Sequence, residues 1–419
     1  MKIQKYISIT VITLFAINAQ AAGYQLQEFS DNAMGRAFSG AGVVGDDNSA
    51  IAYNPAGMAF VKNAGFQMGA VGINLHAKLR GTSQDATGTA KSDRTSTNIF
   101  RIVPNFYGQY RLNEKLVAGM GLYVPYGLSA DYKNNWFGTT HGQYSGITVV
   151  NLTPALSYSF TNELAVGVGI NVQYAQAHLT GGLPIQGTTN MRADDMGLGY
   201  IVGITYRPIQ STRLGLSYRS AVTHKLKGYN KVDGVHPMIT GLMGLTDGKY
   251  DVFAKITTPE TITFSLAHDI NKKWTVSNTI RWTRWSQFRD LNIMQRGLGA
   301  TPLSSTFENW KNTWFVGVGA DYHYCNNLTL RLGVGLDETP IKAPEYRTAR
   351  IPDERRTLMS IGASYKKNNW QVDVGYMHIF IRKARAEGMA RQRPDSHASF
   401  DATYHLNSDI VGLQYQYNF

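Results

Sequence analysis

Few residues of this 419-residue chain are spaced in a way that could support catalysis. Paired carboxylates can act as a general acid and base, and the adjacent aspartate pairs are Asp46 with Asp47 and Asp194 with Asp195. The ten histidines are scattered, so no spacing joins one to a nucleophile, and no H-E-x-x-H zinc motif occurs. We expect solvated or hydrogen-bonding roles for the acidic pairs. We expect no catalytic residue, metal site or cofactor, and a protein that is not an enzyme.

Binding of an apolar ligand is a second kind of chemistry, and residues 228–249 have the composition for it. This stretch lies between two predicted strands, yet it carries several large apolar side chains: Val235, Met238, Ile239, Leu242, Met243 and Leu245. Methionine-rich surfaces adapt to irregular apolar ligands, and an exposed apolar patch usually marks a binding site. A companion connection, residues 179–194, offers Leu183 and Ile185. Together the two connections predict an entry groove.

Residues 1–21 have the pattern of a secretory signal. Lys2 and Lys5 precede a short apolar core, and Ala19-Gln20-Ala21 fits the small-x-small cleavage pattern. No later segment has the 18 or more consecutive apolar residues that a membrane helix needs. If the exported chain enters a membrane, it must therefore do so with strands.

Strict two-residue alternation over long segments supports that alternative. From Val411 to Phe419, apolar and aromatic residues alternate with Gly412, Gln414, Gln416 and Asn418, and residues 164–175, 328–337 and 370–377 behave similarly. A soluble β-sandwich also alternates, but it normally has shorter strands and no terminal aromatic residue. The pattern predicts an all-β transmembrane antiparallel barrel in the outer membrane of a Gram-negative bacterium.

About fourteen strands account for the alternating segments. Their predicted spans are 64–79, 99–111, 115–126, 144–160, 163–178, 194–207, 212–226, 249–268, 272–288, 308–324, 327–336, 353–366, 368–383 and 402–419. Short turns alternate with long connections, which are predicted at 80–98, 127–143, 179–193, 227–248, 289–307, 337–352 and 384–399. This rhythm is typical of a barrel with short periplasmic turns and long external loops.

Residues 22–58 precede the first strand and alternate poorly. Five glycines interrupt any helix or strand of useful length: Gly35, Gly40, Gly42, Gly45 and Gly57. We expect this segment to fold inside the barrel as a plug. The predicted domains are a signal peptide at 1–21, a hatch at 22–63 and the barrel at 64–419. A plug also argues against a general hydrophilic porin.

With these features the chain resembles the long-chain fatty acid transporter (FadL) family of Gram-negative outer membranes. The resemblance covers the mature chain and rests on AGYQLQEFS, GRAFSGAGVVGDD and Asn54-Pro55-Ala56, then LSYRSAV…LKG, TRWSQF and DETP…IPDERR. It implies a fourteen-stranded barrel filled by an N-terminal hatch, with a substrate route that leaves sideways through the wall. Burying a sixteen-carbon chain is worth roughly 13 kcal/mol, so release into lipid costs far less than release into water.

The resemblance also assigns roles to particular residues. It implies that Tyr24, the third residue of the mature chain, reaches into the substrate pocket and that Asn54, Pro55 and Ala56 secure or gate the hatch near the wall. Proline cannot donate a ladder hydrogen bond, so Pro125 predicts a break in the third strand, where the family has an inward kink. The alternative is that Pro125 only ends that strand at the outer surface. The expected gate is Pro125, Tyr126 and Gly127, and the expected substrate contacts are Tyr24, Leu26, Ala177, Leu179, Met191, Arg192, Met238, Leu242 and Met243.

A fatty acid carboxylate needs a cation or several donors when it leaves water. The basic residues that serve the resembled family fall at Gly181 and near Thr306 in this chain, where neither residue is basic. Arg192 is the substitute we favour, among nearby candidates that include His178, Arg289, Arg296 and Lys311. Two substrate classes therefore stay open, a long-chain fatty acid and an uncharged aromatic hydrocarbon.

The formal net charge of +12 favours anionic surroundings over nucleic acid, because the basic residues are spread over a barrel. Some of them lie in a predicted external loop and could face lipopolysaccharide phosphates: Arg382, Lys383, Arg385, Arg391 and Arg393. The partners we expect are a hydrophobic small molecule and the outer membrane with its lipopolysaccharide. We expect the protein to be a monomer.

Overall fold

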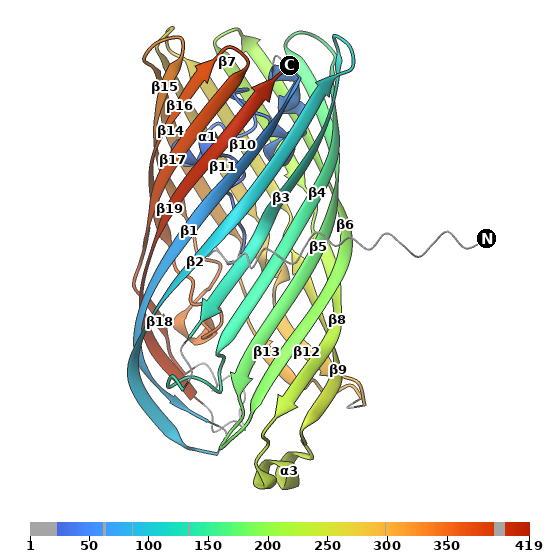
Figure 1. The fold of residues 1–419 in the computed structure, drawn as a ribbon, viewed down its shortest axis with the longest axis vertical. Helices are drawn as coiled ribbons and strands as arrows, with labels where there is room; N and C mark the ends of the chain where they lie inside the picture. The colour runs from blue at the N-terminus through green and yellow to red at the C-terminus, as the bar shows by residue number, and fades with distance from the viewer. Residues whose placement is uncertain (1–22, 62–63, 86, 133–134, 298, 389–398) are drawn as a thin grey trace, which may run out of the picture.

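A computed structural model describes residues 23–61, 64–85, 87–132, 135–297, 299–388 and 399–419. The predicted signal peptide at 1–21 lies outside the described residues. The chain forms a closed antiparallel barrel of 14 strands, confirming the predicted fold class (Figure 1). The last strand pairs with the first along their whole lengths, from Gly65 opposite Asn418 to Gln84 opposite Ser399.

The strands follow one another around the barrel in chain order. The first half contains β1 (Gly65–Gln84), β2 (Ala90–Arg111), β3 (Leu116–Asp131), β4 (Tyr144–Ser159), β5 (Leu164–Gly182), β6 (Thr188–Ile209), β7 (Thr212–Arg219), β8 (Val222–Asp233), β9 (Gly248–Thr258) and β10 (Thr261–Asp269). The second half contains β11 (Trp274–Thr283), β12 (Asp290–Gln295), β13 (Ser304–Phe307), β14 (Thr313–His323), β15 (Leu328–Asp337), β16 (Arg356–Lys367), β17 (Trp370–Ile381), β18 (Ala384–Ala386) and β19 (Ser399–Asn418). Some spanning strands are divided in two. β7 and β8 pair with different parts of β6, and β13 pairs with β12 while β14 pairs with β11.

Two connections that the sequence predicts to be long are mostly strand. β1 and β2 extend to Gln84 and Ala90, so the connection predicted at 80–98 is a short turn, and β5 and β6 fill most of 179–193. These extensions carry serine, threonine and charged residues on both faces. The apolar alternation that identifies a lipid-facing strand is therefore absent there, although the ladder continues.

The outer face of the barrel is apolar and the inner face is largely polar. Val411 and Leu413 on β19 are 59% and 60% exposed, whereas the alternating Gln414 is fully buried. This is the arrangement expected of a wall that faces lipid. Among the described residues, no helix is long and apolar enough to span a bilayer.

Residues 23–61 pack inside the barrel, near the end that holds the C-terminus (Figure 1). They include the helix α1 (Asp31–Gly35), the helix α2 (Ala50–Tyr53) and the 3-10 helix η1 (Pro55–Phe60). α1 contacts β15, β16, β17 and β19, while η1 contacts β3, β4, β5 and β6. We call residues 23–61 the hatch. The division at residues 22–63 stays a prediction.

Glycines in the wall make room for the hatch. A Cβ atom added to Gly167 on β5 would lie 2.2 Å from the Ala56 nitrogen, and one added to Gly333 on β15 would lie 2.1 Å from the Arg36 carbonyl carbon. Any larger residue would push the hatch away. The close approach of backbone to backbone therefore explains glycine on the inner faces of these two strands.

A buried ion-pair network ties the hatch to the wall. Arg36 Nη1 donates to Asp46 at 2.7 Å and to Asp321 of β14 at 2.9 Å, and Arg331 of β15 also contacts Asp46 at 3.2 Å. Burial opposes the charge on Asp46, but Arg36 and Arg331 hold the pKa of that carboxyl below its usual range. Asp47 accepts hydrogen bonds from the serines at 30 and 49. The hydrogen-bonding role expected for this acidic pair fits these contacts.

Candidate functional site

The third strand bends into the lumen at Pro125. The register between β3 and β4 shifts between Tyr123 and Tyr126, so one extra residue of β3 is accommodated as a β-bulge. Every residue from Tyr123 to Ala130 is buried, which means that neither face of this part of β3 meets the outside. The strand does not end at Pro125, since it continues to Asp131.

Beyond this bend β3 separates from β2. Their ladder ends where Phe106 pairs with Leu122, although β2 continues beside β1 to Ala90 and β3 continues beside β4 to Asp131. Pro104 follows on the β2 side and Pro125 on the β3 side, and neither can donate a ladder hydrogen bond. The wall therefore lacks main-chain pairing between these two described segments.

The hatch occupies part of the edge that β2 leaves free. Gln25 forms an antiparallel bridge with Tyr126, in which Leu26 donates to the Pro125 carbonyl and Gly127 donates to the Tyr24 carbonyl, each at 2.8 Å. The first residues of the hatch thus act as a short extra strand on the bent part of β3.

Tyr24 lies in a cage of aromatic rings. Its ring centroid is 4.7 Å from that of Trp285, 5.8 Å from Phe288, and 5.9 Å from both Tyr126 and Trp310. The phenol donates to the Thr257 carbonyl at 3.2 Å, and burial raises the pKa of Tyr24, so the ring stays neutral. Edge-to-face contacts of this kind add to the burial of apolar area.

Gly23 is required for this placement. Its φ is +64°, and an added Cβ would lie 2.6 Å from the Trp310 ring. Its amide donates to Asp353 at 3.2 Å. The chain can therefore turn tightly beside Trp310 and carry Tyr24 into the cage.

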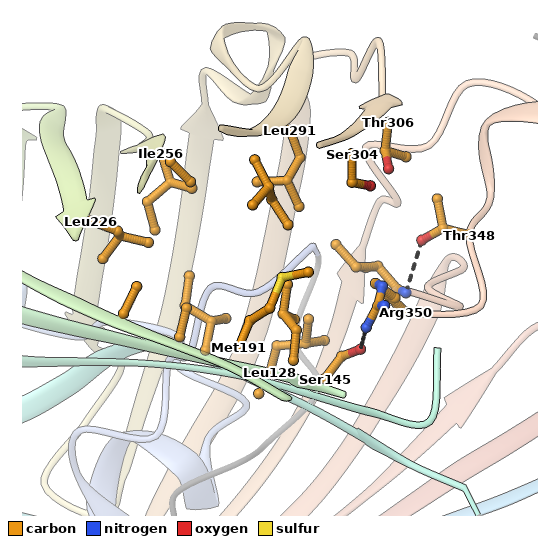
Figure 2. Close-up of a pocket in the computed structure, with 18 of the residues that line it drawn as sticks. Leu128, Ser145, Met191, Leu226, Ile256, Leu291, Ser304, Thr306, Thr348 and Arg350 are labelled. Atoms are coloured by element: carbon orange, nitrogen blue, oxygen red, sulfur yellow. Dashed lines mark hydrogen bonds between the residues drawn. The ribbon is translucent and has the colours of Figure 1, made fainter. Parts of the chain in front are cut away.

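A pocket extends from Tyr24 toward the end of the barrel that carries the helix α3 (Pro237–Met243). Its cavity volume is about 150 Å³. Aliphatic side chains from neighbouring strands make up one part of it: Leu128, Met191, Leu226, Ile256 and Leu291. Polar side chains gather at the other part, around Arg350 (Figure 2). The pocket therefore suits a molecule that is apolar for most of its length.

Arg350 belongs to the connection between β15 and β16, which also contains the 3-10 helix η3 (Pro344–Tyr346). Its Nη1 donates to Ser145 Oγ at 2.8 Å (Figure 2) and to two backbone carbonyls at 3.4 Å. Within the described residues, no carboxylate lies within 4.0 Å of this guanidinium. Burial lowers the pKa of Arg350 to about 10, so it is a cation at neutral pH.

Glu308 is the acidic residue that lines the same pocket. It is only 2% exposed, and Trp310 Nε1 donates to it at 3.1 Å. Burial raises its pKa to about 8. Glu308 is therefore mostly neutral at pH 7, and it leaves the positive charge of Arg350 uncompensated.

The structure brings some of the expected substrate contacts together. Tyr24, Ala177, Leu179 and Met191 line the pocket. Leu26 is buried in the core between hatch and wall instead, and Met238 on α3 is 49% exposed. Leu242 and Met243 also belong to α3, but their side chains lie outside the described part of the structure.

Arg192 lies on the opposite face of β6 from Met191 and is exposed, so it does not line the pocket. The other basic candidates do not line it either: His178, Arg289, Arg296 and Lys311. The two-residue period of the strand explains this outcome, because a shift of one residue moves a side chain to the other face. Sequence reasoning missed Arg350, which lies just before the IPDERR stretch that carries part of the family resemblance.

The residues expected to form the gate lie on β3, and those expected to secure the hatch lie at the start of η1 beside β6. Pro125, Tyr126 and Gly127 form the bent edge described above, and Tyr126 donates to the Pro259 carbonyl at 3.0 Å. Asn54 caps η1, which starts with Pro55 and Ala56, and donates to the Ile204 carbonyl of β6 at 3.2 Å. The bond from Asn54 to β6 fastens the hatch to the wall.

Over residues 12–419 the chain matches the family described as Outer membrane protein transport protein (OMPP1/FadL/TodX). The long-chain fatty acid transport protein of Escherichia coli (strain K12) is 28% identical over 411 residues, covering 88% of this chain and 90% of its own length. Outer membrane protein P1 of Haemophilus influenzae (strain Rd) is 26% identical, and the alignment covers 98% of each chain.

Solved structures share the fold. A Pseudomonas aeruginosa FadL homologue superposes with a TM-score of 0.86 at 23% identity, over 95% of this chain and 100% of that chain. The Pseudomonas putida toluene transporter TodX gives a TM-score of 0.68 at 17% identity, with the same coverage. The predicted family is confirmed: this chain belongs to the OMPP1/FadL/TodX family of outer-membrane transport proteins, whose members move hydrophobic compounds across the outer membrane of Gram-negative bacteria.

Proposed function

We propose that the protein takes up long-chain fatty acids by ligand-gated passive diffusion and releases them sideways into the membrane. The observation that carries this proposal is a single cation, Arg350, at one end of an otherwise largely apolar pocket. An acyl chain would lie along the aliphatic part and its carboxylate would face the guanidinium. The Escherichia coli relative named as a long-chain fatty acid transport protein supports this choice.

Arg350 stands close to the positions where the resembled family has its basic residues. A Cβ added to Gly181 would lie 3.7 Å from Arg350 Nη2, and Thr306 lines the same pocket. Nη1 already has three acceptors, but Nε and Nη2 donate to no oxygen among the described residues. A fatty acid carboxylate would supply acceptors for these donors.

A sideways exit agrees with the order of side chains along β4. Ser145 and Ile147 line the pocket, Asn151 and Thr153 follow, and Ser157 then bonds to the Ala56 carbonyl of the hatch. Asn151 and Thr153 are hydrogen-bonded to Asn171 of β5 and form a buried polar layer with it. An acyl chain crossing that layer would separate polar groups without replacing their bonds. The unpaired segments of β2 and β3 offer a route into lipid instead.

The hatch would link binding to this exit. A ligand that enters the aromatic cage competes with Tyr24 for contact with Phe288 and Trp285. Because Tyr24 and Leu26 are hydrogen-bonded to the bent part of β3, displacement of Tyr24 would move that edge. Asn54, Pro55 and Ala56 would meanwhile hold the rest of the hatch in place. One chain closes the barrel and encloses the pocket, so we propose a monomer.

Uptake of an uncharged aromatic hydrocarbon is the second candidate. The aromatic cage and the toluene transporter TodX, which has the same fold, favour it. An aromatic hydrocarbon would leave Arg350 without an anionic partner. In both cases the hatch, which fills the lumen, argues against a general hydrophilic porin.

Binding of matched ligands to the purified protein distinguishes the candidates. Trp285 and Trp310 flank the pocket, so tryptophan fluorescence can report occupancy. We expect a C16 fatty acid to bind at least about tenfold more tightly than its methyl ester at pH 7, which is the scale of one charge-assisted contact. Equal affinities, or tighter binding of toluene, would support the hydrocarbon alternative.

A further inference from the structure

Three arginines form one row across the outer surface of four neighbouring strands. In the sheet register, Arg385 of β18 lies opposite Thr403 of β19, Thr403 lies opposite Arg80 of β1, and Arg80 lies opposite Arg94 of β2. All three arginine side chains are exposed. Residues opposite one another share a face of the sheet, so the three guanidinium groups project from the same surface.

A fourth cation lies in the next row. Lys78 of β1 is opposite His405 on one side and Ser96 on the other, and it is also exposed. Alternation along β1 places Lys78 and Arg80 on the same face as Phe66 and Met68, which are 37% and 44% exposed. This is the lipid-facing surface. We call Lys78, Arg80, Arg94 and Arg385 the basic row.

Carboxylates lie near the basic row, but none of those in the described residues forms an ion pair with it. Arg80, Arg94 and Arg385 line a surface groove that also contains Asp93, Glu387 and Asp401. Across the described ranges, no carboxylate oxygen lies within 4.0 Å of a basic-row nitrogen. Asp401 accepts a hydrogen bond from the Gly388 amide at 2.8 Å, and Asp93 accepts one from the Arg94 amide at 2.6 Å.

Two like charges directly opposite one another on neighbouring strands destabilise a sheet. The pairing of Arg80 with Arg94 is therefore unfavourable in the isolated protein, and an anion between the two side chains would relieve it. Arginine presents planar sets of N–H donors that match phosphate oxygens. Threonine and serine hydroxyls at 403 and 96 lie in the same two rows and can add donors.

The height of the row on the wall indicates where such an anion would come from. Lys78 is twelve residues beyond Phe66, which pairs with Tyr417 next to the C-terminus. At about 3.3 Å per residue and a tilt of about 40°, that separation spans roughly 30 Å of membrane thickness. The basic row thus lies where the hydrocarbon layer ends on the side of the long connections.

The neighbouring wall suits acyl chains. Phe100 and Ile102 of β2 are 58% and 48% exposed on the same face, between the basic row and the middle of the apolar band. A ligand held here would have phosphates at the row and hydrocarbon chains against these side chains. Free phosphate would bind at the basic row alone and would not contact Phe100 or Ile102.

We propose that the basic row is a binding site for the phosphates of an outer-leaflet glycolipid of the lipid A type. The site lies on the outer surface of the barrel, whereas the substrate pocket lies inside it, and the site is independent of the proposed transport substrate. Its occupant would fix part of the surrounding membrane to β1, β2 and β19, beside the place where β2 and β3 separate.

Native mass spectrometry of the full mature protein with purified lipid A tests the site. The variant is R80Q/R94Q, and the matched control is K366Q/K367Q, which removes two exposed cations at the turn between β16 and β17. We expect R80Q/R94Q to bind lipid A at least about tenfold more weakly than wild type, with the control unchanged. Circular dichroism and resistance to unfolding in SDS verify that each variant keeps its barrel.

The second part of the test varies the ligand instead of the protein. Dephosphorylated lipid A should bind wild type about as weakly as intact lipid A binds R80Q/R94Q, and millimolar inorganic phosphate should not displace intact lipid A. Equal binding of the two lipids, or equal loss in both variants, would overturn the site. Full displacement by inorganic phosphate would overturn the assignment to a lipid.

Discussion

The carbonyl oxygen of Tyr24 accepts a hydrogen bond from the Gly127 amide at 2.8 Å. Tyr24 lies in the aromatic cage at the pocket, and Gly127 belongs to the part of β3 that has separated from β2. One hydrogen bond therefore joins the place where a ligand would be sensed to the edge where it would leave.

Deleting Pro125 should block exit without abolishing binding. β3 carries one extra residue between Tyr123 and Tyr126 relative to β4, so the deletion removes the register shift and lets β3 continue straight. We expect cellular uptake of fatty acid to fall by about tenfold or more, because a continuous ladder with β2 would close the wall. Uptake of labelled oleate by cells that express the variant gives the measurement.

A matched control is P125A, which keeps the extra residue and therefore the bulge. It should retain most of its uptake. If the deletion variant transports as fast as P125A while folding correctly, the bend in β3 is not the exit.

Fatty acid binding should weaken as the pH rises through about 8. Burial raises the pKa of Glu308 to about 8, so this carboxyl is neutral below that pH and anionic above it. An anion here would repel a carboxylate at Arg350. Only about one tenth of the protein has neutral Glu308 at pH 9, so we expect a loss of affinity of about tenfold between pH 7 and pH 9. Fluorescence titrations across this range measure it.

The variant E308Q stays neutral and should keep nearly constant affinity over the same range. An identical pH dependence in wild type and E308Q would exclude Glu308 as its origin. Toluene carries no charge, and its binding should be insensitive to pH in both proteins.

Removing Arg36 should loosen the hatch. The guanidinium bonds to Asp46 and to the buried Asp321, and its loss leaves Arg331 as the one cation that the network's described contacts still offer to the two carboxylates. Breaking a buried pair in this way costs about 3–5 kcal/mol. We expect R36A to show larger and longer conductance steps in planar bilayers than the wild type.

The control for this experiment is R382A, because Arg382 is exposed at the end of β17. Its conductance should equal that of the wild type. If the planar-bilayer conductance of R36A is as small as that of the wild type, other contacts suffice to hold the hatch.

The sequence predicts the barrel well because lipid-facing strands have a strict period of two. The run from Val411 to Phe419 identifies β19, and the confirmed fold class rests on such segments. Strand ends beyond the apolar band are predicted poorly. Around Gln84 and Ala90, both faces are polar and the period gives no signal, although the hydrogen-bonded ladder continues.

The pocket is predicted only in part. Tyr24 and Met191 are both among the expected substrate contacts, and both line it. Arg350 could not be found in this way, since it lies in an irregular connection whose path depends on tertiary contacts such as that with Ser145. Arg192 is expected to contact the substrate, but it lies one residue after Met191, on the outward face of β6. Such an error reverses the direction of a side chain in a strand.

Arg350 is the residue on which the proposed substrate class depends. R350Q removes the charge but keeps a polar side chain of similar reach, and R192Q makes the same change on the exposed face of β6. A charge-assisted hydrogen bond contributes about 1.5–3 kcal/mol, which corresponds to roughly ten- to hundredfold in affinity. The loss should apply only to ligands that carry a carboxylate.

The most direct test is therefore the affinity of wild type, R350Q and R192Q for a C16 fatty acid and for the fatty alcohol of equal length, measured by calorimetry at pH 7. The account predicts that R350Q loses at least about tenfold for the acid and almost nothing for the alcohol, with R192Q unchanged for both. Undiminished binding of the acid to R350Q, or equal losses for acid and alcohol, would contradict it.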